Sequence, residues 1–388
     1  MYPPHHLGGY ELIWRGAVRH LRARGYEMRI LTTDFRVGSP DPALPEDPDC
    51  HRELRWYWRD HRFPRISPRA RLRLERHNLA TLERHIRGFE PDLVTWWAMG
   101  GMSMSLVESV ARRELPALAV VMDDWPSYGP AVDRWQRPLR GRPRLGRLVE
   151  RRSGIPTLRD LAGATRWTFI SRAQHERIEG FIGPLPGATV ANAGVDMSLF
   201  QAAGEHEWRW RLLYCGRIDR RKGIDLAIRA LQLLPDEATL TIVGRGDEEH
   251  AAELVGLARD LRVSERVRFE RVPRDRLAAL FADHDVFLFP VRWKEPWGLV
   301  PLEAMAVGRP VVATLKGGAT EYLRPWENCL SFDAGSAVQL AGAVQRLATD
   351  SELRAKLRAG GRQTAAQHTA RAFNERVVEE LRAAVSRS

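Results

Sequence analysis

The chain has 388 residues, which is more than one average domain of roughly 150 residues and predicts at least two. Hydrophobic residues make up 44% of it and charged residues 28%, a composition that supports buried cores and excludes disorder as the main state. The formal net charge is +11, but only four of the 60 basic residues are lysine. Such a bias looks like codon composition, so we expect no nucleic acid partner.

Cysteine usage and the apolar runs bear on the cell compartment. Cys50, Cys215 and Cys329 are far apart and form no Cys-x-x-Cys pair, which argues against a disulfide framework and a zinc site and fits a reducing cytoplasm. No apolar run approaches the roughly 20 residues of a membrane span. Residues 1–6 lack the basic and apolar regions of a signal peptide. We therefore expect a cytoplasmic protein.

Short β-rich apolar runs alternate with amphipathic stretches along nearly the whole chain, as in parallel α/β domains. Helices are predicted over 11–24, where Val18 and Leu21 share one face, and over 69–89. Strands are predicted in the first half over 27–32, 92–97, 117–122, 166–170 and 189–192. In the second half they are predicted over 211–215, 240–244, 267–269, 285–289, 310–313 and 329–332.

The polar stretch 201–207 predicts a domain boundary near residue 200. We expect two doubly wound α/β domains, residues 1–198 and 199–369, that face each other across a central cleft. The end of the chain, 370–388, is expected to form a helix that crosses back to the first domain. In doubly wound sheets ligands bind beyond the carboxyl ends of the strands, so the loops that follow strands are the candidate sites.

One stretch, 134–152, departs from this pattern because it holds eight arginines, with only Asp133 and Glu150 as acidic residues in or beside it. It also contains two prolines and two glycines. Two interpretations stay open: a solvated mobile loop, and an arm that meets an anionic acceptor or an anionic membrane surface.

The strand 211–215 runs directly into the sequence Gly-Arg-Ile-Asp-Arg-Arg-Lys-Gly (216–223), where a helix is predicted to begin. A glycine turn at a helix N-terminus is suited to a diphosphate, because backbone amides and the helix dipole lie on one side and the cations Arg217 and Lys222 on the other. Three of the four lysines, Lys222 among them, lie in loops that follow strands. This favours a binding loop over an ordinary exposed turn.

After the strand 285–289, Glu295 in a loop is followed eight positions later by Glu303 within a new helix. Gly298 and Leu299 can present backbone amides to a phosphate at that helix start, and Glu303 can accept hydrogen bonds from a ribose diol. Glu295 is expected to point into the cleft. The alternative is that both are surface glutamates near a helix start, where carboxylates favour the dipole anyway.

Two glycine-containing loops give weaker signals. The sequence Gly-Gly-Ala-Thr-Glu (317–321) offers a backbone that a ligand can approach closely. The sequence Gly-Arg-Gly-Asp (244–247) lacks the third glycine of a dinucleotide fingerprint, so we interpret it as a tight turn.

Taken in order, GRIDRRKG, EPWGLVPLEAMAVGRPVVAT and GGATEYL resemble the retaining, nucleotide-sugar-dependent glycosyltransferases of family 4, which have two Rossmann-like domains in the GT-B arrangement. Residues 2–11 look like that family's glycine-rich loop, and 170–171 and 192–200 look like later landmarks. The resemblance implies transfer of a hexose-type sugar from a nucleoside diphosphate, with uridine slightly favoured over guanosine. The acceptor would be a hydroxyl of a glycan, a lipid-linked molecule or a small molecule, bound by the first domain.

The resemblance also implies the residues that hold the donor. Arg217 and Lys222 would neutralise its diphosphate, and Gly8 and Gly9 would approach it from the first domain. Similar enzymes need no metal ion or other cofactor, because the cations and the helix N-terminus stabilise the leaving group.

Glu303 would hold the ribose and Glu295 would contact the donor sugar. Transfer would retain the anomeric configuration, by same-face attack in which the leaving diphosphate helps to accept the acceptor's proton. Many similar enzymes carry a His-Asp pair after the fourth strand of the first domain, where this chain has Asp123-Asp124. Either Asp123 contacts the sugar hydroxyl itself, or the acceptor subsite differs.

The glycine-rich loop begins at residue 2, so the strand that should precede it is absent from the sequence. We expect a short upstream apolar segment, about seven to ten residues long, to supply that strand. Two other classes of function stay open: a nucleotide-sugar epimerase or phosphorylase on the same fold, and a non-catalytic binding protein.

Overall fold

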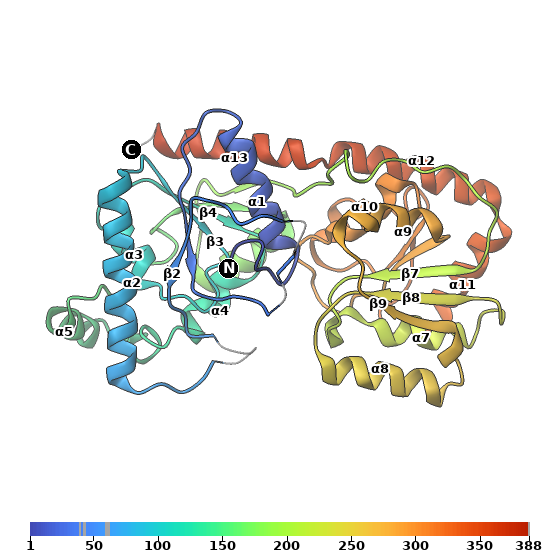
Figure 1. Cartoon of the computed structure of the whole chain (residues 1–388), viewed down its shortest axis with the longest axis horizontal. Coiled ribbons are helices and arrows are strands. Elements are labelled where there is room, and N and C mark those ends of the chain that lie inside the picture. Colours follow the sequence, from blue (N-terminus) through green and yellow to red (C-terminus); the bar gives the residue numbers. More distant parts are fainter. Residues whose placement is uncertain (39, 42–43, 59–62, 387–388) are drawn as a thin grey trace. The chain divides into compact units, whose positions relative to one another are not determined.

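The computed structural model describes residues 1–38, 40–41, 44–58 and 63–386 (Figure 1). The chain forms two compact units: the first consists of 1–191 and 374–388, and the second of 192–373. The sequence analysis places these boundaries at 198 and 369, a few residues from the ones observed.

The second unit is built on a six-stranded sheet. Its strands are β7 (Arg211–Cys215), β8 (Thr239–Val243), β9 (Val267–Glu270), β10 (Val286–Phe289), β11 (Val311–Ala313) and β12 (Leu330–Ser331). Their spatial order is β12-β11-β10-β7-β8-β9, and every neighbouring pair is parallel. The first strand is therefore central and the order reverses between β7 and β10, which is the switch point of a doubly wound sheet. All six predicted strands are confirmed. Four of them, β7, β8, β10 and β11, are apolar runs with buried interiors, which the sequence shows directly, whereas β9 and β12 are partly exposed.

Helices surround this sheet. They are α7 (Ile224–Leu231), α8 (Glu248–Asp260), α9 (Leu277–Asp283), α10 (Leu299–Val307), α11 (Ala337–Thr349) and α12 (Ser351–Gln367). Fully buried residues of α7, α11 and the strands form one continuous core, which includes Leu212, Ile228, Val286 and Val344. Helix α10 is apolar on almost all sides, and its residues from Pro301 to Val307 are all buried. The loops at the switch point are thus held by rigid elements.

The first unit contains two separate parallel sheets. One is β3 (Val94–Trp97), β4 (Ala117–Val121), β5 (Arg166–Phe169) and β6 (Thr189–Val190), and the other is β1 (Ile30–Thr33) with β2 (Cys50–Leu54). In the second unit β7 joins the two halves of the sheet. Among the described residues, no strand takes that place between β1 and β3. The expectation of an upstream strand stays a prediction.

The sequence analysis missed β2, whose residues Cys50–Leu54 are mostly polar and half-buried. Its pairing with β1 is parallel, from Ile30 with Cys50 to Thr33 with Leu54. These residues form a strand because they pair with β1, and the local sequence of β2 does not reveal this pairing.

The helices of the first unit are α1 (Gly9–Arg22), α2 (Pro68–Phe89), α3 (Ser105–Ala111), α4 (Trp125–Val132), α5 (Pro143–Ser153) and α6 (Arg172–Ile182). Helix α13 (Ala370–Val385) ends the chain, and its residues from 374 onward belong to the first unit. The predicted helices 11–24 and 69–89 are confirmed as α1 and α2. Among the residues that the structure describes, no helix is both long and apolar enough to cross a membrane.

The interpretation of 134–152 as a mobile loop is wrong. This stretch contains the short 3₁₀ helix Arg137–Leu139 and the three-turn helix α5. Pro143 takes the first helical position, where its missing N–H costs nothing, and Gly154 ends the helix with a φ of 73°. Of the prolines and glycines in this stretch, Pro143 therefore marks the start of a helix, and Gly146 lies buried within that helix.

Candidate active site

The loop after β7 is shaped by Gly223, which precedes α7 with a φ of 67°. A Cβ atom there would lie 2.1 Å from the carbonyl oxygen of Pro290, so the close approach requires glycine. The backbone N–H of Arg292 donates to the carbonyl oxygen of Arg221 over 2.8 Å. The loops that follow β7 and β10 are therefore clamped together at the switch point of the sheet.

This clamp brings Lys222 and Glu295 into contact. The Lys222 Nζ lies 2.6 Å from Glu295 Oε2, and the indole N–H of Trp293 donates to the same oxygen over 2.6 Å. The two charged side chains are only 13% and 14% exposed. The carboxylate thus fixes a partly buried ammonium, which also lies over the Trp293 ring, 5.7 Å from its centroid.

Arg217 lies in the same loop and is exposed. Its guanidinium makes no hydrogen bond or ion pair with the residues that the structure describes, whereas its carbonyl oxygen accepts from the Tyr214 hydroxyl over 2.8 Å. The nearby Asp219 carboxylate is held by Arg221, which lowers the pKa of Asp219 well below its usual range. Asp219 therefore has Arg221 as its hydrogen-bond partner, and the Arg217 guanidinium has none among the described residues.

The N-terminus of α10 begins at Gly298, whose φ is 87°. A Cβ atom there would lie 2.9 Å from the Phe289 ring, and the Tyr322 hydroxyl donates to the Gly298 carbonyl oxygen. No side chain caps this helix, so the amides of the first turn, beginning at Leu299, have no side-chain acceptor. The helix start therefore has backbone donors without a side-chain acceptor, and their binding of a phosphate stays a prediction.

Glu303 lies one turn further along α10 and is only 2% exposed. Its Oε1 accepts from the Nη2 of Arg274 over 3.0 Å, and burial raises the pKa of the Glu303 carboxyl. With Glu295 also largely buried, the alternative that both are surface glutamates is wrong. We missed Arg274, for which the only sequence signal is its position in the loop after β9.

The glycine pair in the 3₁₀ helix Gly317–Glu321 supports the Glu295 loop. The N–H of Gly318 donates to the Glu295 carbonyl oxygen over 2.8 Å. A Cβ atom on Gly317, whose φ is 66°, would lie 2.2 Å from that oxygen. The pair thus allows close packing of two loops.

The predicted tight turn at 244–247 is wrong, because Gly246 forms a parallel bridge with Ile218. A hollow of about 290 Å³ lies in the second unit, lined by this loop and by residues of α8 and β9. The N-terminal turn of α8 beside it carries Glu248 and Glu249 behind the N-cap Asp247. These carboxylates already interact with the positive end of the helix and repel a phosphate. Arg245 and Arg271 also line the hollow, so its lining carries both signs of charge, whereas Arg217 and Lys222 make the loop after β7 cationic.

In the first unit, Gly8 and Gly9 lie at the start of α1. Gly8 is the N-cap and provides no side-chain acceptor, and Gly9 is exposed. The hydroxyl of Tyr10 accepts from the N–H of Ala98 and donates to the carbonyl oxygen of Val120, so the helix start is fixed to the ends of β3 and β4.

Asp123 follows β4 and has an unusual environment. Its Oδ2 accepts from the Tyr128 hydroxyl over 2.8 Å, while its Oδ1 is buried without a hydrogen-bond partner. Burial raises the pKa of Asp123 to about 7, and the charges of Asp124 and Glu11 add to this effect. Gly8, Gly9 and Asp123 belong to the first unit, whereas Arg217, Lys222, Glu295, Gly298, Leu299 and Glu303 belong to the second.

The raised pKa of Asp123 predicts how stability depends on pH. The folded state favours the protonated carboxyl, so its stabilising contribution is present below the ordinary pKa of 3.8 and is lost as the pH rises through about 7. Asp123→Asn should therefore raise the Tm at pH 8 by at least about 2–4 °C, the shift that roughly 1 kcal/mol produces in a domain of this size. Near pH 4 the two proteins should melt together. A difference in Tm that is equal at both pH values would contradict the buried carboxyl.

Groups that could hold a metal ion are few. In the described part of the chain, one cluster of three qualifies: the ligand atoms of His51, Glu53 and His85 lie within 4.8 Å of one another. This cluster belongs to β2 and α2, outside the loops described above, and Arg84 already forms an ion pair with Glu53. The expectation that donor binding needs no metal stays a prediction.

Comparison with known proteins adds to this geometry. Residues 198–364 match the family described as "Glycosyl transferases group 1". A GDP-mannose-dependent alpha-(1-6)-phosphatidylinositol monomannoside mannosyltransferase of Mycolicibacterium smegmatis is 34% identical over 216 residues, which are 50% of this chain and 56% of that protein. The lipopolysaccharide core biosynthesis glycosyltransferase LpsE of Rhizobium meliloti is 38% identical over 149 residues, 38% of this chain and 42% of that protein. The chain thus spans about half the length of the curated relatives it matches.

Solved structures cover nearly the whole chain. Sucrose-phosphate synthase from Thermosynechococcus elongatus has a TM-score of 0.73 at 23% identity, over 99% of this chain and 97% of that one. A glycosyltransferase from Rickettsia africae has a TM-score of 0.69 at 15% identity, over 98% and 96%. The predicted fold class is confirmed: the chain has the GT-B fold, with two Rossmann-like domains. Membership of family 4 in particular stays a prediction.

Proposed function

We propose, for a GT-B chain whose residues 198–364 match the glycosyl transferases group 1, that it transfers a hexose-type sugar from a nucleoside diphosphate to a hydroxyl acceptor. The observation that carries the proposal is the pairing of Lys222 with Glu295 at the switch point, where ligands of doubly wound sheets bind.

The proposed diphosphate site uses three sources of positive charge. Arg217 has its guanidinium directed to no described partner, Lys222 is oriented by Glu295, and the start of α10 at Gly298 has no side-chain cap. When the glycosidic bond breaks, the leaving diphosphate gains negative charge, so donors placed in advance stabilise the transition state more than the ground state. Such an arrangement supports catalysis without a metal ion.

Glu303 is proposed to bind the ribose. Its Oε1 is held by Arg274, which fixes the carboxylate orientation and leaves Oε2 as an acceptor for a diol. Glu295 is proposed to contact the donor sugar, since its carboxylate lies beside the proposed diphosphate site. Same-face attack, with the leaving diphosphate accepting the acceptor's proton, would retain the anomeric configuration.

The donor base and the acceptor are further parts of the proposal. One curated relative is named as GDP-mannose-dependent. A protein of similar fold, HepE of Anabaena, was crystallised with UDP and glucose, at a TM-score of 0.62 and 20% identity over 82% of this chain and 83% of that one. Both bases therefore enter the test, and the preference for uridine stays a prediction.

Thermal stabilisation by nucleotides tests the proposed function. A ligand that binds only the folded state raises the free energy of unfolding, by about 2.7 kcal/mol when its concentration is 100 times its Kd. The Tm rises with it. One of UDP and GDP, with one of its hexose derivatives, should raise the Tm well above what adenosine diphosphate gives. Incubation with that sugar nucleotide should then release the nucleoside diphosphate.

Two outcomes would overturn the proposal. Stabilisation without any release, with acceptors supplied, would indicate a non-catalytic binding protein. Conversion of the sugar nucleotide into an epimer without loss of the diphosphate would indicate an epimerase.

A further inference from the structure

Helix α5 (Pro143–Ser153) presents two different faces. Gly146, Val149, Glu150 and Ser153 face the rest of the first unit and are buried or half-buried. The opposite face is exposed and consists of Arg144, Leu145, Arg147, Leu148, Arg151 and Arg152. We call these six residues the outer face of α5.

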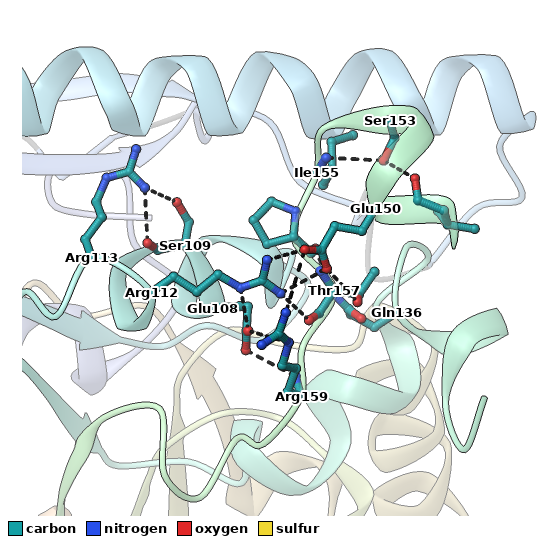
Figure 2. A network of polar contacts seen from close by, with 12 residues as sticks. Glu108, Ser109, Arg112, Arg113, Gln136, Glu150, Ser153, Ile155, Thr157 and Arg159 are labelled. Atoms are coloured by element: carbon teal, nitrogen blue, oxygen red, sulfur yellow. Dashed lines mark hydrogen bonds and ion pairs between the residues drawn. The ribbon is translucent and has the colours of Figure 1, made fainter. Parts of the chain in front are cut away.

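Polar contacts anchor the inner face. Figure 2 shows Glu150 directed toward Arg112 of the segment after α3 and toward Thr157. The Arg112 Nη2 lies 3.0 Å from Glu150 Oε2, and the Thr157 hydroxyl donates to the same oxygen over 3.2 Å. Arg112 lowers the pKa of Glu150, so the carboxylate stays ionised. A Cβ atom on Gly146 would lie 3.2 Å from the Thr157 hydroxyl, so the helix packs closely there.

This anchoring determines the charge of the outer face. Glu150 is the only acidic residue of α5, and its partners Arg112 and Arg159 lie outside the helix. None of the four outer-face arginines forms an ion pair with a residue that the structure describes. Arg137, Arg140 and Arg142, which come just before the helix, are exposed as well.

Two leucines interrupt this cationic surface. Leu145 is 39% exposed and Leu148 is 45% exposed, and they lie one turn apart. Binding of a polyanion in water needs only the charges and gains nothing from exposed leucines. A helix at a lipid surface uses both: its arginines contact the headgroups and its apolar side chains enter the acyl boundary.

We propose that the outer face of α5 docks the protein on a bilayer that contains anionic lipids. Arginines contact the headgroups, and Leu145 and Leu148 insert between them. The proposal goes beyond sugar transfer, since it concerns a surface of the first unit and needs neither donor nor acceptor. A nucleic acid or an acidic glycan would use the charges alone.

Vesicle binding by the full-length protein tests this proposal. Cosedimentation is measured with vesicles of phosphatidylcholine alone and of phosphatidylcholine mixed with phosphatidylglycerol, without nucleotide. The parent should bind only the mixed vesicles and should be released as salt shortens the Debye length. The fourfold variant R144S/R147S/R151S/R152S should bind at least about tenfold more weakly, because each arginine near the surface contributes to the attraction.

Two further variants separate the causes. L145S/L148S keeps the charge and should still lose several-fold in affinity, which a purely electrostatic contact would not. The matched control R229S/R259S/R268S/R371S removes the same charge from exposed arginines that form no ion pair among the described residues, and it should bind like the parent. Thermal melting of each variant should match that of the parent, since no altered side chain is buried.

Three results would overturn the proposal. One is equal binding by the parent and the fourfold outer-face variant. Another is equal weakening by the control variant, which would indicate net charge alone. The third is unchanged binding of L145S/L148S, which would indicate a site for polyanions in general. Since nucleotide stabilisation is measured without lipid, failure here leaves the proposed function intact.

Discussion

Lys222→Ala is expected to lower kcat by about 10²- to 10³-fold, the loss seen when one preorganised donor to a developing negative charge is removed. The Lys222 ammonium is only 13% exposed and lies 2.6 Å from Glu295, so its position is set before any donor binds. Arg217→Ala should show a loss of the same kind, because the exposed Arg217 guanidinium has no described partner and its proposed one is the diphosphate. Both variants should also bind the donor more weakly.

Arg220→Ala is the matched control for these two substitutions. Arg220 lies in the same 3₁₀ helix (Arg220–Lys222) but forms an ion pair with Glu253 of α8, away from the proposed site. It should keep kcat within about twofold of the parent, since an exposed ion pair contributes little. Steady-state assays of nucleoside diphosphate release measure all three variants. Equal kcat for Lys222→Ala and Arg220→Ala would remove Lys222 from the mechanism.

Glu295→Gln and Glu303→Ala are expected to fail in different ways. Glu295→Gln should lose most of its turnover, because the charge of Glu295 is proposed to act on the sugar. It should bind nucleoside diphosphate nearly like the parent, because the glutamine oxygen can still accept the hydrogen bond that holds Lys222 in place. Glu303→Ala should bind free nucleoside diphosphate and intact donor about 10- to 100-fold more weakly, the range for loss of a hydrogen bond to a charged group. The ribose is far from the bond that breaks, so the kcat of Glu303→Ala at saturating donor should fall less than that of Glu295→Gln.

Calorimetric titration with nucleoside diphosphate and steady-state kinetics separate these two effects. Glu303→Gln serves as the control for folding, because Glu303 is buried against Arg274 and alanine would leave that guanidinium without its partner. The assignment fails if Glu295→Gln keeps near-normal kcat while Glu303→Ala binds nucleotide as tightly as the parent.

The sequence alone predicted most of the second unit. Strands β7, β8, β10 and β11 are short apolar runs with buried interiors, whereas β9 and β12 are partly exposed. The spacing of Glu295 and Glu303 and the turn 216–223 are equally local features. They could be found because the loops that follow strands are the ones that bind ligands in such sheets.

Local patterns were less informative where a segment depends on its neighbours. Strand β2 was missed because its residues are polar, and it is a strand by pairing with β1. Helix α5 was missed because Pro143 and Gly146 are residue types typical of loops. The helix is held by Glu150, which contacts Arg112 from 38 positions away. Nothing in the composition of either segment indicates these partners.

The contacts within the site were decided by tertiary structure. Lys222 and Glu295 are 73 positions apart, and Arg274 and Glu303 are 29 apart. The sequence identified three of these four residues as functional but could not pair them. The pairing of Lys222 with Glu295 follows from strand order: β10 lies beside β7, so the loops after these two strands meet at one edge of the sheet. Periodicity determines which residues form strands, whereas strand order arises from the packing of the whole sheet, and so the charge pair exists only in the folded unit.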